Sequence, residues 1–181
     1  MLVIEIKGNE MWDEGAEQFV YDRPSLTLHL EHSLHAIAEW EAKHQIPFLG
    51  GNLTDDQIRD YITFMAEEPI TIEDVNRLST KQYQQIANYM NDKMSATWFS
   101  DRNDKHNPNN GEVVTSELIY YWMAASQIPF SCDRWHFNRL MTLIRICSIK
   151  NQPPKKMSRS ATMAQNDALN KARRARLKSK G

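Results

Sequence analysis

The stretch SLTLHLEHSLHAIAEWEAKHQ, residues 25–45, changes its hydrophobic period partway along. Its first part alternates apolar and polar residues, which is the pattern of a strand with one buried face, and the apolar positions are Leu26, Leu28 and Leu30. From about His32 the apolar residues recur at helical spacing, at Leu34, Ile37 and Ala38. The sequence therefore predicts a strand that passes directly into a helix.

Two further strand-like segments precede this junction. LVIEI, residues 2–6, is rich in branched residues, and EQFVYD, residues 17–22, lies just before Pro24. A two-stranded element on its own is only marginally stable, so its apolar face needs cover. We therefore expect a small antiparallel sheet or hairpin that packs on the rest of the chain.

Helices are expected downstream of the junction, where apolar residues keep a helical period. They fall at residues 54–68, 71–79, 80–94, 114–127 and 132–151, and the longest loop is expected at residues 100–111. Thr54 and Gln57 have the spacing of a capping box. The last two helices are strongly apolar, and we expect them to supply the centre of the core: Trp122, Met123, Trp135, Leu140, Met141, Leu143, Ile144 and Cys147.

The chain of 181 residues, with 41% hydrophobic content, is long enough for one domain with a tail. QPPKKMSRS, residues 152–160, is typical of a linker, and a final helix is expected over residues 161–178. The predicted fold class is α+β and mostly α-helical: a small N-terminal antiparallel β element, a helical bundle and a basic C-terminal helix. The expected divisions are 1–31 for the β element packed on the body, 32–150 for the helical core domain, and 151–181 for the linker and basic helix.

The body and the tail carry opposite charge. From Lys150 onward there are ten basic residues against Asp167 alone, a net charge of +9, whereas residues 1–149 have 12 basic and 22 acidic residues, a net charge of −10. Such a tail pairs with nucleic-acid phosphates or with an acidic protein surface, including another copy of the chain. Because no aromatic residue interleaves its cations, base stacking is missing, and we favour a protein partner. The candidate partner-binding residues are Lys171, Arg173, Arg174, Arg176, Lys178 and Lys180.

Two clusters have residue types that are used in catalysis or metal binding. His29, His32 and His35 are evenly spaced, but they straddle the strand–helix junction, so solvent-facing or capping roles are favoured over a metal site. Cys132 lies four residues before His136 at a helix start, a position that favours a reactive thiolate, but free cysteines are more often small buried residues. We therefore predict no catalytic site, no metal site and no cofactor, and hence no enzyme.

Further sequence patterns argue against a calcium site, a signal peptide, a membrane span and disulfides. Residues 101–112 resemble a calcium loop, but Lys105 occupies a ligand position and His106 stands where glycine is needed, so the match is rejected. The first ten residues include an acid at position five and no long apolar run, which argues against a signal peptide. The chain has no apolar run of about 18 residues, and its two cysteines lack disulfide spacing. We expect no membrane span and a reducing compartment.

Three blocks of sequence resemble a group of proteins encoded by long-tailed bacteriophages. They are LEHSLHAIAEWEAKHQIPFL at residues 30–49, DKMSATWF at residues 92–99, and a long block from residue 117 to 158 that contains RWHFNRL. A WE…PFL helix end, an ATWF block and a W-H-x-N-R-L helix follow in this order, and the similarity spans residues 25–172. The chain departs from the group in a longer glycine break, LGGN at residues 49–52.

Members of this group are regarded as candidate tail assembly chaperones. The resemblance implies a non-enzymatic protein of the host cell cytoplasm that binds the tape measure protein, promotes tail tube assembly and has the tail tube protein as a second partner. Self-association between copies would extend such contacts, and related proteins often have a frameshifted longer form. Two alternatives stay open: a structural virion protein of the phage neck or tail, and a basic-tailed regulator that binds nucleic acid.

Overall fold

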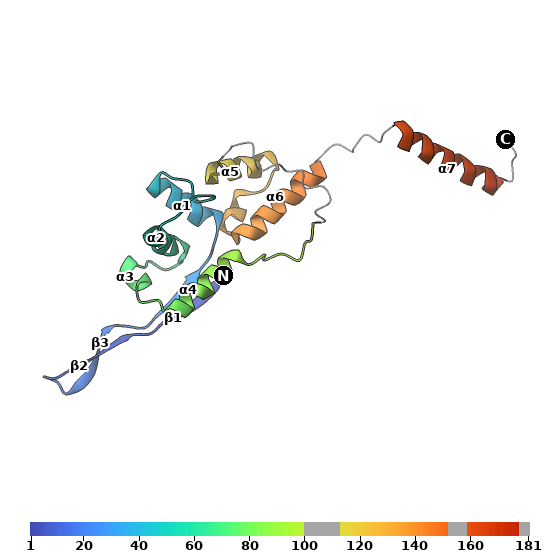
Figure 1. Ribbon diagram of the computed structural model, residues 1–181. Coiled ribbons are helices and arrows are strands. Elements are labelled where there is room, and N and C mark those ends of the chain that lie inside the picture. The colour runs from blue at the N-terminus through green and yellow to red at the C-terminus, as the bar shows by residue number, and fades with distance from the viewer. Residues whose placement is uncertain (100–112, 152–158, 178–181) are drawn as a thin grey trace. The chain divides into compact units, whose positions relative to one another are not determined.

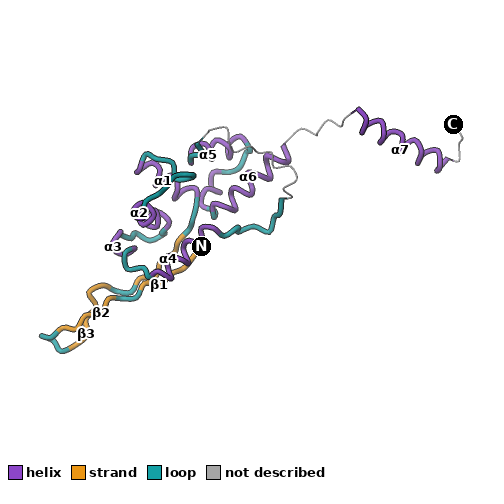
Figure 2. Tube along the Cα trace, viewed as in Figure 1, coloured by secondary structure: helices purple, strands orange, loops and turns teal. Residues whose placement is uncertain are grey.

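The computed structural model describes residues 1–99, 113–151 and 159–177, so the long loop expected at residues 100–111 and most of the expected linker lie outside the described residues. Contacts divide the chain into two compact units, Met1–Ser148 and Ile149–Gly181. The described residues are mostly helical, with two small antiparallel strand pairs, and the predicted α+β class is confirmed (Figures 1 and 2).

Strands form the start of the first unit: β1 (Leu2–Ile6), β2 (Asn9–Asp13), β3 (Gln18–Arg23) and β4 (Leu26–Leu30). β1 pairs antiparallel with β4, and β2 pairs antiparallel with β3. Alternate side chains of β1 and β4 are buried, namely Ile4, Ile6, Leu28 and Leu30. The strand β2 was not predicted, because the sequence NEMWD offers little apolar alternation, and it folds as a strand through its pairing with β3.

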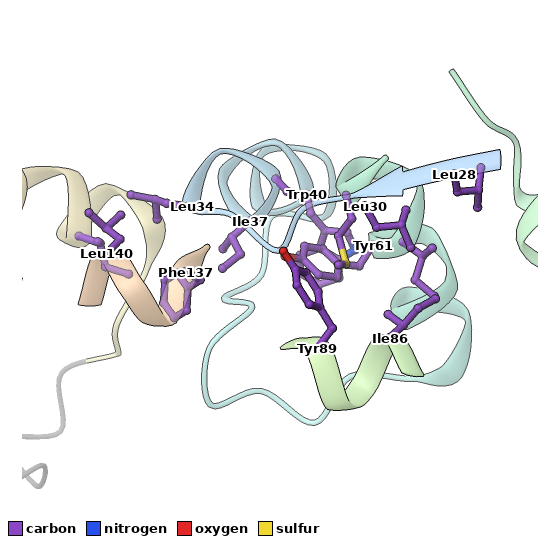
Figure 3. Close-up of a cluster of buried hydrophobic side chains, with 14 of the residues drawn as sticks. Leu28, Leu30, Leu34, Ile37, Trp40, Tyr61, Ile86, Tyr89, Phe137 and Leu140 are labelled. Carbon is purple, nitrogen blue, oxygen red and sulfur yellow. The ribbon is translucent and has the colours of Figure 1, made fainter. Parts of the chain in front are cut away.

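The predicted strand–helix junction lies between β4 and α1 (Leu34–His44). Ser33 is the N-cap of α1, and its hydroxyl accepts the backbone N–H of Ala36 at 3.2 Å. One side of the helix is buried, at Leu34, Ala36, Ile37, Trp40 and Glu41. α1 therefore lies within the core of the unit, where Figure 3 shows its side chains among those of several other elements.

The helix α2 (Asp55–Met65) packs against both α1 and β4. Thr54 and Gln57 form the predicted capping box at its start. The fully buried Trp40 donates its indole N–H to the carbonyl oxygen of Gln57 at 3.2 Å, which ties α1 to α2. At the other end, the N–H of Glu31 donates to the carbonyl oxygen of Met65 at 2.8 Å, so α2 is also tied to the end of β4.

Two further helices, α3 (Ile72–Val75) and α4 (Thr80–Asn91), connect this layer to the strands. Each helix begins with its own capping box, in which the N-cap residue is Thr71 for α3 and Ser79 for α4. The Gln82 amide donates to the carbonyl oxygen of Glu5 at 2.8 Å, and the Tyr89 hydroxyl donates to Glu31 at 2.7 Å. α4 is thereby held against β1 and the end of β4.

The last part of the unit contains α5 (Ser116–Ala125), the 3-10 helix η2 (Phe130–Arg134) and α6 (Phe137–Asn151). The single helix predicted from Cys132 is interrupted, because the N–H of Phe137 donates to the carbonyl oxygen of His32 at 2.7 Å. The break also changes the predicted core. Met123, Leu140 and Ile144 are buried as predicted. Four further predicted core residues are only partly buried, namely Trp122, Met141, Leu143 and Cys147. The prediction for Trp135 is wrong, because this residue is 36% exposed.

The second unit contains α7 (Arg159–Leu177), which starts two residues before the predicted helix and is described to within one residue of its predicted end. All side chains of α7 that the structure describes are exposed. Helices in proteins gain most of their stability from packing one face against another part of a structure.

Glu41 is a buried carboxylate that joins α1 to two other segments. One oxygen accepts the N–H of Phe48 and the other accepts the N–H of Ser116, both at 2.8 Å. The N-cap residue of α5, Thr115, makes no side-chain cap hydrogen bond, so Glu41 caps that helix from 75 positions away in the sequence. A negative charge is favoured at a helix N-terminus. The contact with Ser116 therefore hydrogen-bonds the buried carboxylate of Glu41 and orients α5 at the same time.

We expect Glu41→Ala to lower the free energy of unfolding by about 3 kcal/mol, because two hydrogen bonds to a charged acceptor are lost. Glu41→Gln keeps one acceptor oxygen and should lose about half of that amount. Urea unfolding of the intact protein measures both changes. Glu39→Ala, which removes an exposed carboxylate from the same helix, is the control, and an effect as large as that of Glu41→Ala would contradict the capping role.

His32 lies in a buried cluster of polar side chains. Its Nδ1 is 2.7 Å from the Tyr61 hydroxyl, and its ring is edge-on to that of His136, with 5.5 Å between centroids. His136 in turn donates from Nε2 to the carbonyl oxygen of Tyr89 at 2.9 Å. Burial, followed by the nearby His136, lowers the pKa of His32 to about 3, and burial raises the pKa of Tyr61 well above its usual value. Both side chains are therefore neutral in the folded protein at neutral pH.

The protein should lose stability as the pH falls below about 6.5, the pKa of a histidine in the unfolded chain. Since the folded pKa is about 3, unfolding takes up a proton on His32 throughout this window, and the contribution amounts to about 2 kcal/mol between pH 7 and pH 5. His32→Gln should flatten this slope in urea unfolding measured across pH, whatever its effect at pH 7. His35→Gln changes an incompletely buried histidine and should keep the slope, whereas an unchanged slope in His32→Gln would show that another group causes it.

Candidate binding surfaces

The β2–β3 hairpin carries an exposed aromatic pair. Trp12 and Phe19 lie directly opposite each other, with their rings edge-on and 5.0 Å between centroids. The two residues are 52% and 67% exposed, so much of both side chains is in contact with solvent. Figure 1 shows the hairpin extending from the β1–β4 pair beyond the helices of the same unit. The pair stabilises the hairpin and at the same time leaves apolar surface in contact with solvent.

The tip of this hairpin is acidic. Asp13 closes the turn, because its Oδ1 accepts the N–H of Gly15 at 2.8 Å and the N–H of Ala16 at 3.2 Å. Glu14 and Glu17 follow in the same turn, and both are exposed. The sequence of residues 9–23 contains five acidic residues and one arginine, a net charge of −4. The aromatic pair is thus presented next to negative charge.

The base of the hairpin is fixed to α3 and its flanking residues. The guanidinium of Arg77 donates to the carbonyl oxygen of Lys7 at 2.7 Å and to that of Pro24 at 2.9 Å, so it joins both strands where they leave the β1–β4 pair. Arg23 forms ion pairs with Glu73 and, at 3.9 Å, with Asp74. Hydrogen bonds from Thr71, with further attraction from the two arginines, lower the pKa of Asp74. The hairpin is therefore anchored at its base and exposed at its tip.

The predicted basic site lies partly on α7. Four of its basic residues are exposed and lie in the last two turns of α7: Lys171, Arg173, Arg174 and Arg176. The negative end of the helix dipole favours cations at this position. Lys178 and Lys180 lie outside the described residues. The exposed apolar side chains of α7 are those of Met163, Leu169 and Leu177. Whether these basic residues bind a partner stays a prediction.

A third surface is formed by the Lys93–Phe99 segment, which runs from the end of α4 along α6. The Asn138 amide of α6 donates to the carbonyl oxygen of Asp92 at 2.7 Å, and the Arg145 guanidinium lies 4.0 Å from the centroid of the Phe99 ring. Trp98 is 86% exposed, the highest value among the exposed large hydrophobic residues of the described chain. The ammonium group of Lys93 lies over its face, 3.7 Å from the ring centroid.

The sequence blocks that carry the phage resemblance meet in the first unit. The block at residues 30–49 contacts the block at residues 117–158 through the hydrogen bond from Phe137 to His32. The block at residues 92–99 contacts the same helix through the hydrogen bond from Asn138 to Asp92. Residues 30–49, 92–99 and the part of the third block up to residue 148 therefore contact one another in the first unit, and Trp98 is exposed there.

The structure places the predicted histidines and Cys132 in different surroundings. His29 forms an ion pair with Glu68, His32 is buried, and His35 lies 3.9 Å from Asp133, so the three side chains have separate partners. The expectation of solvent-facing or capping histidines was therefore wrong for His32. Cys132 is buried, as its structural interpretation predicts. Within residues 1–99, 113–151 and 159–177, no group of His, Cys, Asp and Glu is arranged to hold a metal ion.

Sequence reasoning expected a small sheet or hairpin, but it missed the strand β2 that pairs with β3, and it missed the exposure of Trp98. The hairpin has a recognisable signal, because Trp12 and Phe19 flank the turn-like sequence DEGAE. Trp98 has no such signal, since its exposure depends on how the segment lies along α6. An aromatic residue in an apolar neighbourhood is normally expected in the core.

Comparison with protein-family models, curated proteins and solved structures found no match to this chain. In the part of the chain that the structure describes, no helix has the length and apolar character needed to cross a membrane.

Proposed function

We propose that this protein is a phage tail assembly chaperone, which binds the tape measure protein in the host cell cytoplasm and promotes assembly of the tail tube around it. The observation that carries the proposal is the set of large exposed side chains within the phage-like blocks: Trp98, Tyr121, Phe130 and Trp135. Aromatic residues are enriched at the centres of protein interfaces, and exposed apolar surface favours association with a partner. The proposed role involves no chemical reaction, and the tail tube protein is its second partner.

The chemistry of the expected partner fits such a surface. A tape measure protein is a long, largely helical chain with apolar stripes, and it would aggregate if these stripes stayed in water. Amphipathic helices of this type bind by placing their apolar face against exposed apolar side chains of the partner. We infer that Trp98 and Trp135 provide such contacts, and that the flanking basic groups of Lys93 and Arg139, which lie over their rings, hold the indoles in place.

Co-expression with the tape measure protein tests this proposal. The native protein should increase the soluble fraction of the tape measure protein and should co-purify with it in several copies. Trp98→Ser should weaken the complex by roughly 30-fold, because an exposed aromatic contact at an interface centre contributes about 2 kcal/mol, and adding Trp135→Ser should weaken it further. Tyr83→Phe, a change at a partly buried position of α4, is the control and should retain the complex. A tape measure protein that is equally soluble without this protein would exclude the chaperone role.

Mass spectrometry of purified phage particles separates the chaperone from a structural virion protein. A chaperone acts during assembly and should be absent from finished particles, or present at far fewer copies than the tail tube protein. The lysate before particle purification is the matched control, because it should contain the protein in quantity. Stoichiometric amounts in the particle would favour the neck or tail alternative.

A further inference from the structure

The hairpin and α7 each carry exposed apolar side chains next to charge of one dominant sign. On the hairpin, Trp12 and Phe19 are exposed beside Glu14 and Glu17. In the part of the chain that the structure describes, β2 and β3 pair only with each other, and a two-stranded hairpin is marginally stable unless something packs on it. Its own unit anchors the base through Arg77, while the aromatic pair stays exposed. The hairpin therefore has an apolar surface and a net charge suited to a basic partner.

The helix α7 has the complementary properties. From Arg159 to Leu177 the sequence has five basic residues and one acidic residue, a net charge of +4, against −4 for residues 9–23 of the hairpin. Met163, Leu169 and Leu177 offer exposed methyl and methylene groups among these cations. A solitary helix gains stability when a partner covers part of its surface. Arginine also stacks favourably on aromatic rings, so Trp12 and Phe19 fit the chemistry of this helix beyond simple charge pairing.

We propose that the hairpin of one copy binds the α7 helix of a second copy. The aromatic pair packs against the aliphatic and guanidinium groups of the helix, and the acidic tip faces its cations. This is a heterologous contact, because the two surfaces differ, and each bound pair leaves one hairpin and one helix available for further copies. The association needs no tape measure protein, so it goes beyond the proposed function and is tested without that partner.

The test uses two variants of the full chain that each lack one surface. The helix variant carries Arg173→Glu, Arg174→Glu and Arg176→Glu, which keeps good helix formers but reverses the charge. The hairpin variant carries Trp12→Ser and Phe19→Ser, which removes the aromatic pair and leaves the acidic tip. Sedimentation velocity at about 50 mM salt, where charge interactions are weakly screened, measures the mass of each variant alone and of their mixture.

The native protein should show a mass that rises with concentration above the 21.1 kDa of one chain and that falls when salt is added. Each variant alone should associate at least tenfold more weakly. The equimolar mixture should regain association but stop at one copy of each, because the helix variant offers only its hairpin and the hairpin variant only its helix. Recovery limited to pairs is the specific signature of a heterologous contact.

Two controls separate this contact from general effects of charge and solubility. Lys81→Glu with Arg134→Glu reverses exposed charges on the first unit, and Val113→Ser removes an exposed apolar side chain that belongs to neither surface; both proteins should associate as the native chain does. Urea unfolding of every variant should keep a cooperative transition, which shows that the body is folded, and the hairpin variant should lose only the contribution of its aromatic pair. A native protein that is monomeric at all concentrations overturns the proposal. So does a helix variant that still assembles, since hairpins would then pair with each other, and so does a mixture that regains nothing.

Discussion

The burial of the Glu41 carboxylate inside an apolar layer constrains the arrangement of the whole first unit. A charge in this position is tolerated only when it is fully hydrogen-bonded, and the partners are backbone N–H groups of Phe48 and Ser116 from two other segments. The hydrogen bonds place the loop after α1 and the start of α5 against the same helix. Trp40, one residue earlier, ties α1 to α2 in the same way. The packing around α1 thus has specific polar contacts at its centre as well as apolar contact area.

The buried polar groups of the first unit are hydrogen-bonded, whereas other segments of the chain carry exposed apolar side chains. Among the described residues, no buried side-chain nitrogen or oxygen lacks a hydrogen-bond partner. Exposed apolar side chains, in contrast, occur on the hairpin, on the Lys93–Phe99 segment and on α7. The body gains its stability from internal contacts, so the exposed aromatic residues are not required for it. Their exposure is physically costly in a monomer and becomes favourable when a partner covers them.

The proposed binding surfaces use different chemistry, so binding of a partner at one surface need not displace a partner from another. The surface with Trp98 combines aromatic rings with single cations and suits an apolar helix of another protein. The hairpin and α7 combine apolar groups with opposite net charge and suit copies of the same chain. Charge contributes mainly to the rate and orientation of such encounters, and the apolar contacts contribute to their lifetime. One small protein could in this way bind a long partner and line up along it at the same time.

The sequence by itself determined the features that depend on local period, capping and composition. The junction at residues 25–45, the capping box of Thr54 and Gln57, the basic helix and the opposite charges of body and tail all follow from residues close together in the chain. Only the tertiary structure decided the burial of His32, the exposure of Trp135 and the cap that Glu41 supplies to α5. These features depend on contacts between residues far apart in sequence. The type of a residue, apolar or charged, does not determine which distant backbone group it contacts.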